Sequence, residues 1–246
     1  MRGRSVPLSR PRRLVGDLMH FSIGVPRVTV QRRMNLAPLV AARRALDERP
    51  PWTAIFVKGY ALLAQETPEF RRAYVKLPWP HLYEYPESVA AIAHEREIAG
   101  ERAVLQTRTK APGRRSIAEL AALIREAQSL PVMEVREFRR ALNMARVPMP
   151  IRRLMMWLAL NLGRQRAIFF GTFHLSVYSA LGAESFNPLT PLTTLLNYGP
   201  IDPEGQVNVR ILYDHRVMDG ATVARALDRF EEILNGPVAE EVRGAA

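Results

Sequence analysis

One histidine of the sequence lies where a general base would be expected to act. His215 follows residues 206–214, in which apolar and polar side chains alternate as in a half-buried strand. Asp219 and Gly220 come next, where Asp219 can cap a helix and Gly220 permits tight backbone packing against the turn. A histidine at a strand end is fixed by the sheet yet projects beyond it, and it exchanges protons near neutral pH. The same pattern equally fits an ordinary strand–turn–helix junction without chemistry.

The other histidines give no comparable pattern. His20, His81, His94 and His174 show no pairing at metal-ligand spacing, so we expect no metal site. We interpret the first three of them as structural. The sequence contains no cysteine, which excludes disulfides, thiolate zinc sites and cysteine nucleophiles. It also lacks a glycine-rich phosphate loop and a G-x-S-x-G nucleophile elbow.

The elements that must position these residues alternate between strands and helices, with no internal repeat or linker. Patterning predicts strands at 27–31, 73–77, 88–93, 103–107, 167–176, 192–198 and 206–214. It predicts helices after Asn35, at 53–65, after the capping box at Ser116, twice within 134–162, and at 219–234. Since non-adjacent strands must pair, we expect one mixed α/β domain over residues 1–246.

The chain is basic, and its charge is concentrated in two segments. It carries 35 Lys and Arg against 24 Asp and Glu, a formal net charge of +11. Residues 1–33 contain eight arginines and one aspartate, and residues 134–166 contain eight arginines and two glutamates. Such charge suits a nucleic acid, an acidic partner or a membrane surface. Nucleic acid is the least favoured, because the first segment lacks interleaved aromatic residues and no nucleic-acid-binding motif is present.

The most apolar run, residues 154–162, is too short to span a bilayer, which takes about 20 residues. Arginines flank it on both sides and Trp157 lies within it, as in helices that lie on anionic membrane surfaces. The favoured alternative is a core or subunit-interface helix with solvated arginines. No apolar stretch follows the basic start of the chain, so we expect no secretory signal. We expect a cytoplasmic protein, with contact to the inner face of a membrane as an open alternative.

Four segments resemble one known family. Residues 213–221, Y-D-H-R-V-M-D-G-A, are similar to the D-H-R-x-x-D-G-A motif of the 2-oxoacid dehydrogenase acyltransferase (E2) catalytic domain and to the H-x-x-x-D-G motif of chloramphenicol acetyltransferase. Residues 7–13 resemble the opening P-L-S-x-x-R-K of that E2 domain, 26–30 resemble its P-H-V-T strand, and 171–176 resemble its G-T-F-T-I-S segment. Because their order and spacing hold across nearly the whole chain, the sequence resembles a small stand-alone member of this superfamily.

The resemblance implies a two-layer α/β sandwich with a mixed sheet, assembled as a homotrimer with active sites between subunits. His215 is then the general base that deprotonates a thiol, hydroxyl or amine acceptor, which attacks an acyl-CoA thioester. Ser176 of the facing subunit is implied to donate a hydrogen bond to the oxyanion. Thr172 and Ser179 remain open as alternative donors. Neither a metal nor a covalent enzyme intermediate is needed.

The resemblance also assigns supporting roles. Asp219 is implied to be structural and paired with Arg12, although Arg10 or Arg13 fits the same role. His174 stands where the family has a threonine, which leaves open a second acid–base group. A plain strand residue is the favoured interpretation of His174.

Several features depart from the family. The sequence shows no lipoyl or subunit-binding domain, so we expect no lipoyl group on this chain. The resemblance implies coenzyme A as the cosubstrate, in the form of an acyl-CoA. Residues 1–25 are expected to form a basic arm, and the arginine-rich helical insert at 134–166 has no counterpart that aligns. We expect a free-standing trimer. An acidic carrier protein and membrane contact through 151–166 are open as further partners. The alternative function is an inactive acyltransferase-like scaffold or a membrane- or partner-binding protein.

Overall fold

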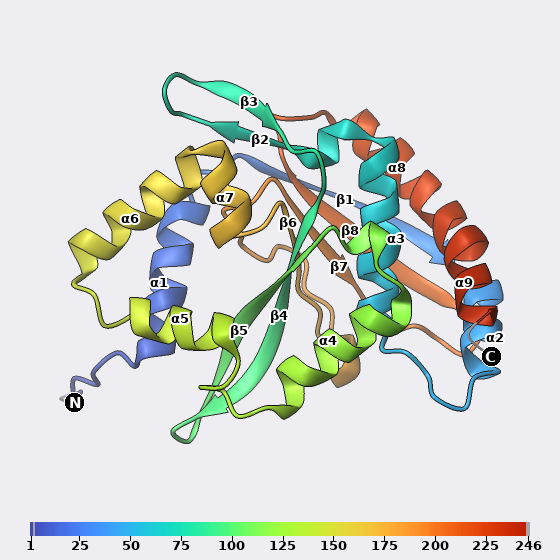
Figure 1. Ribbon diagram of the computed structural model, residues 1–246, viewed down its shortest axis with the longest axis horizontal. Coiled ribbons are helices and arrows are strands. Elements are labelled where there is room, and N and C mark those ends of the chain that lie inside the picture. The colour runs from blue at the N-terminus through green and yellow to red at the C-terminus, as the bar shows by residue number, and fades with distance from the viewer. Residues whose placement is uncertain (2, 245–246) are drawn as a thin grey trace.

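A six-stranded mixed sheet lies at the centre of the computed structural model, which describes residue 1 and residues 3–244 (Figure 1). Arg2 of the expected arm and the last two residues of the expected domain lie outside the described residues. The strands follow the order β1-β8-β7-β6-β4-β5, with β4–β6 and β6–β7 parallel and the other pairs antiparallel. They are β1 (Arg27–Asn35), β4 (Val89–Ile98), β5 (Glu101–Lys110), β6 (Phe173–Leu175), β7 (Thr194–Tyr198) and β8 (Gln206–Asp214). A separate hairpin is formed by β2 (Arg72–Val75) and β3 (His81–Glu84).

Nine α-helices occur among the described residues. They are α1 (Arg10–Ser22), α2 (Ala37–Arg44), α3 (Trp52–Glu66), α4 (Ile117–Ser129), α5 (Arg136–Met144), α6 (Met149–Asn161), α7 (Gly163–Phe169), α8 (Gly220–Ile233) and α9 (Ala239–Arg243). Among the residues the structure describes, no helix is long and apolar enough to cross a bilayer.

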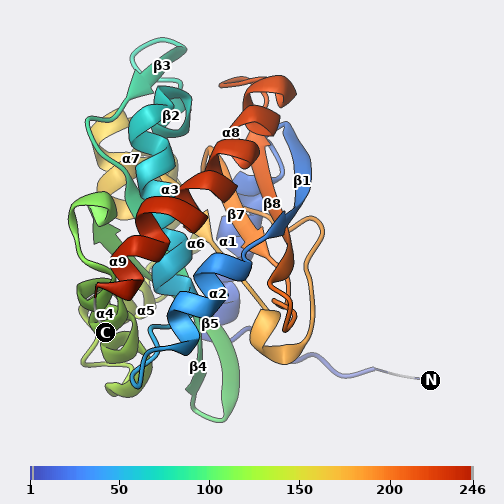
Figure 2. The ribbon, with the colours of Figure 1, turned by 90° about the vertical axis from the view of Figure 1, so that its right-hand side faces the viewer.

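The main hydrophobic core lies between one face of the sheet and the helices α3, α4 and α8 (Figures 1 and 2). The helix α3 is apolar on nearly all sides, and ten of its fifteen residues are buried. Phe56 of α3 stacks on Tyr198 of β7 with ring centroids 3.9 Å apart. The Tyr60 hydroxyl lies 2.5 Å from the Thr194 hydroxyl of the same strand. The expected two-layer sandwich with a mixed sheet is therefore confirmed.

Several expected elements are confirmed, including the helix at 53–65, the strand at 206–214 and two helices within 134–162. The strand expected at 167–176 is wrong in its first half. The helix α7 continues to Phe169, and β6 begins only at Phe173. Gly171 makes this change of direction possible, since its φ is +95° and a Cβ there would lie 2.9 Å from the Val89 carbonyl oxygen.

The expected basic arm is also corrected, because residues 10–22 form the helix α1. Ser9 caps it, accepting a hydrogen bond from the Arg12 amide at 3.3 Å. Asp17 of α1 is buried and binds Arg152 and Arg153 of α6, with 2.9 Å between its Oδ1 and Arg153 Nε. A buried carboxylate requires such cationic partners. The two arginine-rich segments of the sequence are thus joined through the one acidic residue of the first.

Candidate active site

The backbone of the His215 turn is fixed on both sides. Asp214, the last residue of β8, pairs with Arg27 of β1, and the His215 amide donates to the Pro26 carbonyl at 2.9 Å. The Val217 amide closes the turn by donating to the Asp214 carbonyl at 3.0 Å. The imidazole itself is 47% exposed. A rigid backbone with an accessible ring is what a general base requires.

Asp219 lies beside this imidazole, with its Oδ1 3.4 Å from His215 Nδ1. It occupies the N-cap position of α8, but its side chain receives no hydrogen bond from the helix, so the expected side-chain cap is not formed. A carboxylate at Nδ1 favours the tautomer in which Nε2 is free to accept a proton. Gly220 follows, and a Cβ there would approach the Tyr213 hydroxyl to 3.2 Å, which supports the close packing expected at this position.

A second ion pair, between Asp214 and Arg216, stabilises the turn, and it was not predicted from the sequence. Asp214 is fully buried and accepts from Arg216 Nε at 2.9 Å and Nη2 at 2.7 Å. The Arg216 guanidinium also lies over the Tyr74 ring, 4.3 Å from its centroid. The only signal in the sequence was that an aspartate and an arginine flank His215. Such a bidentate pair is rigid and directional, so it holds the ends of the His215 peptide in place.

Ser176 lies one residue beyond the end of β6, toward the end of β7 that is farther from His215. Its amide donates to the Leu196 carbonyl at 3.3 Å, and its carbonyl accepts from the buried Asn197 side chain at 2.6 Å. The residue is buried, and its backbone is held through both its amide and its carbonyl. A fixed backbone of this kind suits an oxyanion donor.

The two alternative donors are placed differently. The Thr172 hydroxyl accepts from the Val89 amide at 2.9 Å and donates to the Val89 carbonyl at 3.3 Å, which ties it to β4. Ser179 begins a short 3₁₀ turn, Ser179–Leu181, beyond the strand. Ser176 differs from both in that its amide and its carbonyl each bond to a residue of β7, Leu196 and Asn197.

His215 and Ser176 do not meet within one chain. Leu175 pairs with Leu196, so Ser176 lies level with Asn197, which in turn pairs with Arg210 of β8. His215 lies five residues beyond Arg210 and two strands away, a separation of roughly 19 Å at ordinary strand spacings. His215 and Ser176 therefore lie toward opposite ends of β7.

Arg12 does not pair with Asp219. It lies on α1, where its Nε contacts Glu101 Oε1 of β5 at 3.0 Å. The physical reason is that α1 packs beside α5 and β5, on the far side of the sheet order from β8. Of the alternatives, the Arg13 Nε donates to the Leu8 carbonyl, and Asp219 has His215 as its ion-pair partner among the described residues.

His174 and His94 are held neutral by burial. His174 Nε2 lies 3.0 Å from Gln106 Nε2, and burial lowers the pKa of His174 to about 4. His94 Nε2 lies 2.8 Å from the Thr107 hydroxyl, and burial, aided by Arg96, lowers the pKa of His94 to about 4. Desolvation disfavours the charged imidazolium in both cases. His174 is therefore a buried strand residue, and its placement gives no support for a second acid–base group.

The remaining histidines, His20 and His81, each contact a residue close to them in the sequence. His20 is exposed on α1 with its ring edge-on to Phe21, and His81 Nδ1 donates to the Trp79 carbonyl at 2.7 Å. Within residues 3–244 and Met1, no group of three His, Asp or Glu side chains is arranged to hold a metal ion.

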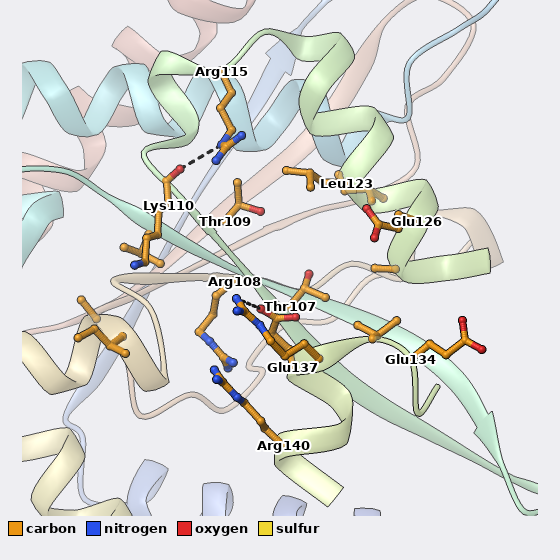
Figure 3. A pocket seen from close by; sticks show the side chains of 17 residues that line it. Thr107, Arg108, Thr109, Lys110, Arg115, Leu123, Glu126, Glu134, Glu137 and Arg140 are labelled. Atoms are coloured by element: carbon orange, nitrogen blue, oxygen red, sulfur yellow. Dashed lines mark hydrogen bonds and ion pairs between the residues drawn. The ribbon is translucent and has the colours of Figure 1, made fainter. Parts of the chain in front are cut away.

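A cavity of about 540 Å³ lies at the outer edge of β5, between α4, α5 and α7 (Figure 3). Arg108 of β5 lines it together with Arg136 and Arg140 of α5. Burial lowers the pKa of Arg108, and the two neighbouring arginines add to this against the opposing effect of Glu137. The cavity is four strands away from β8, so it is separate from the His215 turn.

No known family model matches the sequence, and neither does any curated protein. Solved structures do. The chain is similar to Azotobacter vinelandii dihydrolipoamide acetyltransferase with a TM-score of 0.70 and 19% identity, over 96% of this chain and 93% of that one. It is similar to the cubic core of a pyruvate dehydrogenase multienzyme complex with a TM-score of 0.66 and 19% identity, over 96% and 93%. It is similar to chloramphenicol acetyltransferase with a TM-score of 0.53 and 15% identity, over 93% and 96%.

The chain therefore has the fold of the chloramphenicol acetyltransferase-like acyltransferases. Within that class, its architecture is more similar to these E2 catalytic cores than to chloramphenicol acetyltransferase. The structural resemblance expected from the four sequence segments is confirmed. In the Azotobacter enzyme, a serine, a histidine and an asparagine four residues after that histidine were studied for their role in the catalytic mechanism. His215 and Asp219 have the same spacing.

Proposed function

We propose that the protein is a cytoplasmic acyltransferase that moves an acyl group from an acyl-CoA thioester to a thiol, hydroxyl or amine acceptor. The observation that carries the proposal is the His215 turn, where an exposed imidazole on a rigid backbone has Asp219 at its Nδ1. The acyltransferase fold and the same histidine spacing in the Azotobacter enzyme support it.

In the proposed reaction, His215 Nε2 removes the proton of the acceptor as the acceptor forms a bond to the acyl carbon. The carbonyl oxygen of the thioester becomes an oxyanion, and the Ser176 hydroxyl donates a hydrogen bond to it. When the carbon–sulfur bond breaks, the imidazolium returns its proton to the departing coenzyme A thiolate. Asp219, beside Nδ1, keeps the imidazole oriented with its Nε2 toward the acceptor through both steps.

We further propose that the site forms between two copies of the chain, in a free-standing homotrimer. The separation of His215 from Ser176 within one chain supports this, since a second copy can place its Ser176 beside His215. The basic segments, 1–33 and 134–166, supply cations for the phosphates of coenzyme A or for an acidic carrier protein.

The test is incubation of the pure protein with a panel of acyl-CoA esters and a cell extract. Mass spectrometry then follows free coenzyme A and acylated products for the wild type and for His215→Ala. We expect His215→Ala to abolish product formation while its unfolding curve stays that of the wild type. His20→Ala, at an exposed histidine of α1, is the matched control and should keep full activity. Turnover retained by His215→Ala would contradict the mechanism, and no turnover by the wild type would favour an inactive scaffold.

A further inference from the structure

The helix α6 has a charged side chain on its buried side and apolar side chains on its exposed side, the opposite of an ordinary surface helix. Its buried side contains Arg152, whose guanidinium pairs with Asp17, together with Met156 and Leu160. Its solvent side is apolar, with side chains that are 39% to 58% exposed. These residues, called here the α6 face, are Ile151, Leu154, Met155, Leu158 and Leu162.

The α6 face is continuous. At 3.6 residues per turn the four side chains from Ile151 to Leu158 fall within an arc of about 100°, along roughly 10 Å of helix. Leu162 follows directly after the last residue of α6. Charged residues normally occupy the exposed side of such a helix. A contiguous apolar stripe turned toward solvent marks an interaction surface, because it would otherwise remain in contact with water.

The β2–β3 hairpin lies against the end of α6 (Figure 1). The Leu77 amide donates to the Asn161 carbonyl at 3.3 Å, and the Tyr85 hydroxyl donates to the Gly163 carbonyl at 2.9 Å. The hairpin loop presents Trp79, which is 68% exposed. Tryptophan is enriched where membranes meet water, because its ring is apolar and its N–H is polar.

Charge distinguishes the occupants that this surface could accept. Lys76 and Arg164 are exposed around the same end of α6, and residues 134–166 hold eight arginines against two glutamates. Residues 167–246, which include α8 and α9 on the opposite side of Figure 1, hold ten acidic and five basic groups. The segment that contains α6 is therefore basic, whereas the segment that contains α8 and α9 is acidic. The same face of a second copy would be repelled, whereas an anionic lipid surface would be attracted.

We propose that the α6 face and Trp79 bind the surface of an anionic phospholipid membrane. The helix then lies in the plane of the interface, with its apolar side chains among the upper acyl chains and Lys76 and Arg164 beside the headgroups. Asp17 has a structural part in this arrangement, since it withdraws Arg152 from the face and leaves the stripe free of charge.

The test is co-sedimentation of the full chain with vesicles of phosphatidylcholine and phosphatidylglycerol, compared with vesicles of phosphatidylcholine alone. We expect binding to the anionic vesicles, weakening with salt, and at least about tenfold weaker binding for the double variant Leu154→Ser, Leu158→Ser. The control double variant is Val104→Ser, Leu123→Ser, which removes two comparably exposed apolar side chains from β5 and α4 and should bind as the wild type.

Three results would overturn the proposal. They are equal binding to both kinds of vesicle, unchanged binding by the α6 double variant, and a change in its oligomeric mass in solution, which would make the α6 face a contact between copies. Circular dichroism and unfolding curves establish that each variant is folded. His215→Ala should bind vesicles like the wild type, so this outcome is independent of the proposed acyl transfer.

Discussion

His215 Nδ1 lies 3.4 Å from Asp219 Oδ1, four residues apart in the turn that joins β8 to α8. Asp219 would ordinarily cap α8, but its side chain faces the imidazole instead. The Asp219 carboxylate therefore does not cap α8 and instead lies where it can orient His215.

This contact predicts different outcomes for two substitutions of Asp219. Asp219→Ala removes the acceptor at Nδ1 and should lower kcat about tenfold with little change in KM. Asp219→Asn keeps an acceptor oxygen and should retain most of the activity, since an amide oxygen also accepts from an imidazole N–H. Steady-state kinetics of both variants make the comparison. Equal loss in the two variants would show that the carboxylate charge, rather than orientation, is what matters.

The buried Asp17 predicts a large effect on stability. Asp17→Ala leaves the Arg152 guanidinium buried without a carboxylate, and should lower the free energy of unfolding by about 3–5 kcal/mol. Denaturant unfolding at neutral pH measures it. Arg153→Gln removes only the partly exposed partner of the same carboxylate and should cost about 1 kcal/mol or less. A cost for Asp17→Ala no larger than that of the control would contradict this account of how α1 anchors α6.

The two buried histidines predict a loss of stability in mild acid. Burial lowers the pKa of His94 and of His174 to about 4, so the unfolded chain binds more protons than the native chain between pH 4 and the ordinary histidine pKa of about 6.5. The free energy of unfolding should therefore rise with pH across this window and level off above it. Urea unfolding at several pH values measures the slope.

A double variant isolates the contribution of these histidines. His94→Gln with His174→Gln should flatten the slope between pH 4 and 6.5, because glutamine does not titrate. His20→Gln, at an exposed position of α1, should leave it unchanged. A slope equal to that of the wild type in the double variant would mean that other groups cause the acid sensitivity.

Local signals predicted much of the fold. The apolar run of α3, the alternation of β8 and the capping box at Ser116 each depend on residues close in sequence, and all three are confirmed. The strand expected at 167–176 failed because a short apolar run fits a buried helix as well as a strand. The helix α1 was missed because its stabilising contact, Asp17 with α6, joins segments far apart in the chain.

Only part of the candidate site was predicted, because some of its contacts depend on residues far apart in the sequence. His215 follows from a local strand–turn–helix pattern, and the structure places it where that pattern requires. The pairing of Asp219 with Arg12 was wrong because it depends on how α1 packs. The brace between Asp214 and Arg216 was missed, although it is local, because alternation alone does not show which charged side chains are buried.

The central claim is that each active site takes His215 from one chain and Ser176 from another. The most direct test mixes two variants, His215→Ala and Ser176→Ala, after co-unfolding and refolding so that their chains assemble at random. Each variant alone should lose activity, Ser176→Ala by about 10²–10³ in rate. In equal mixtures about a quarter of the sites would combine an intact His215 with an intact Ser176, so about a quarter of the wild-type release of coenzyme A should return. If the mixture is no more active than the sum of the two variants, the site does not form between chains and the account is contradicted.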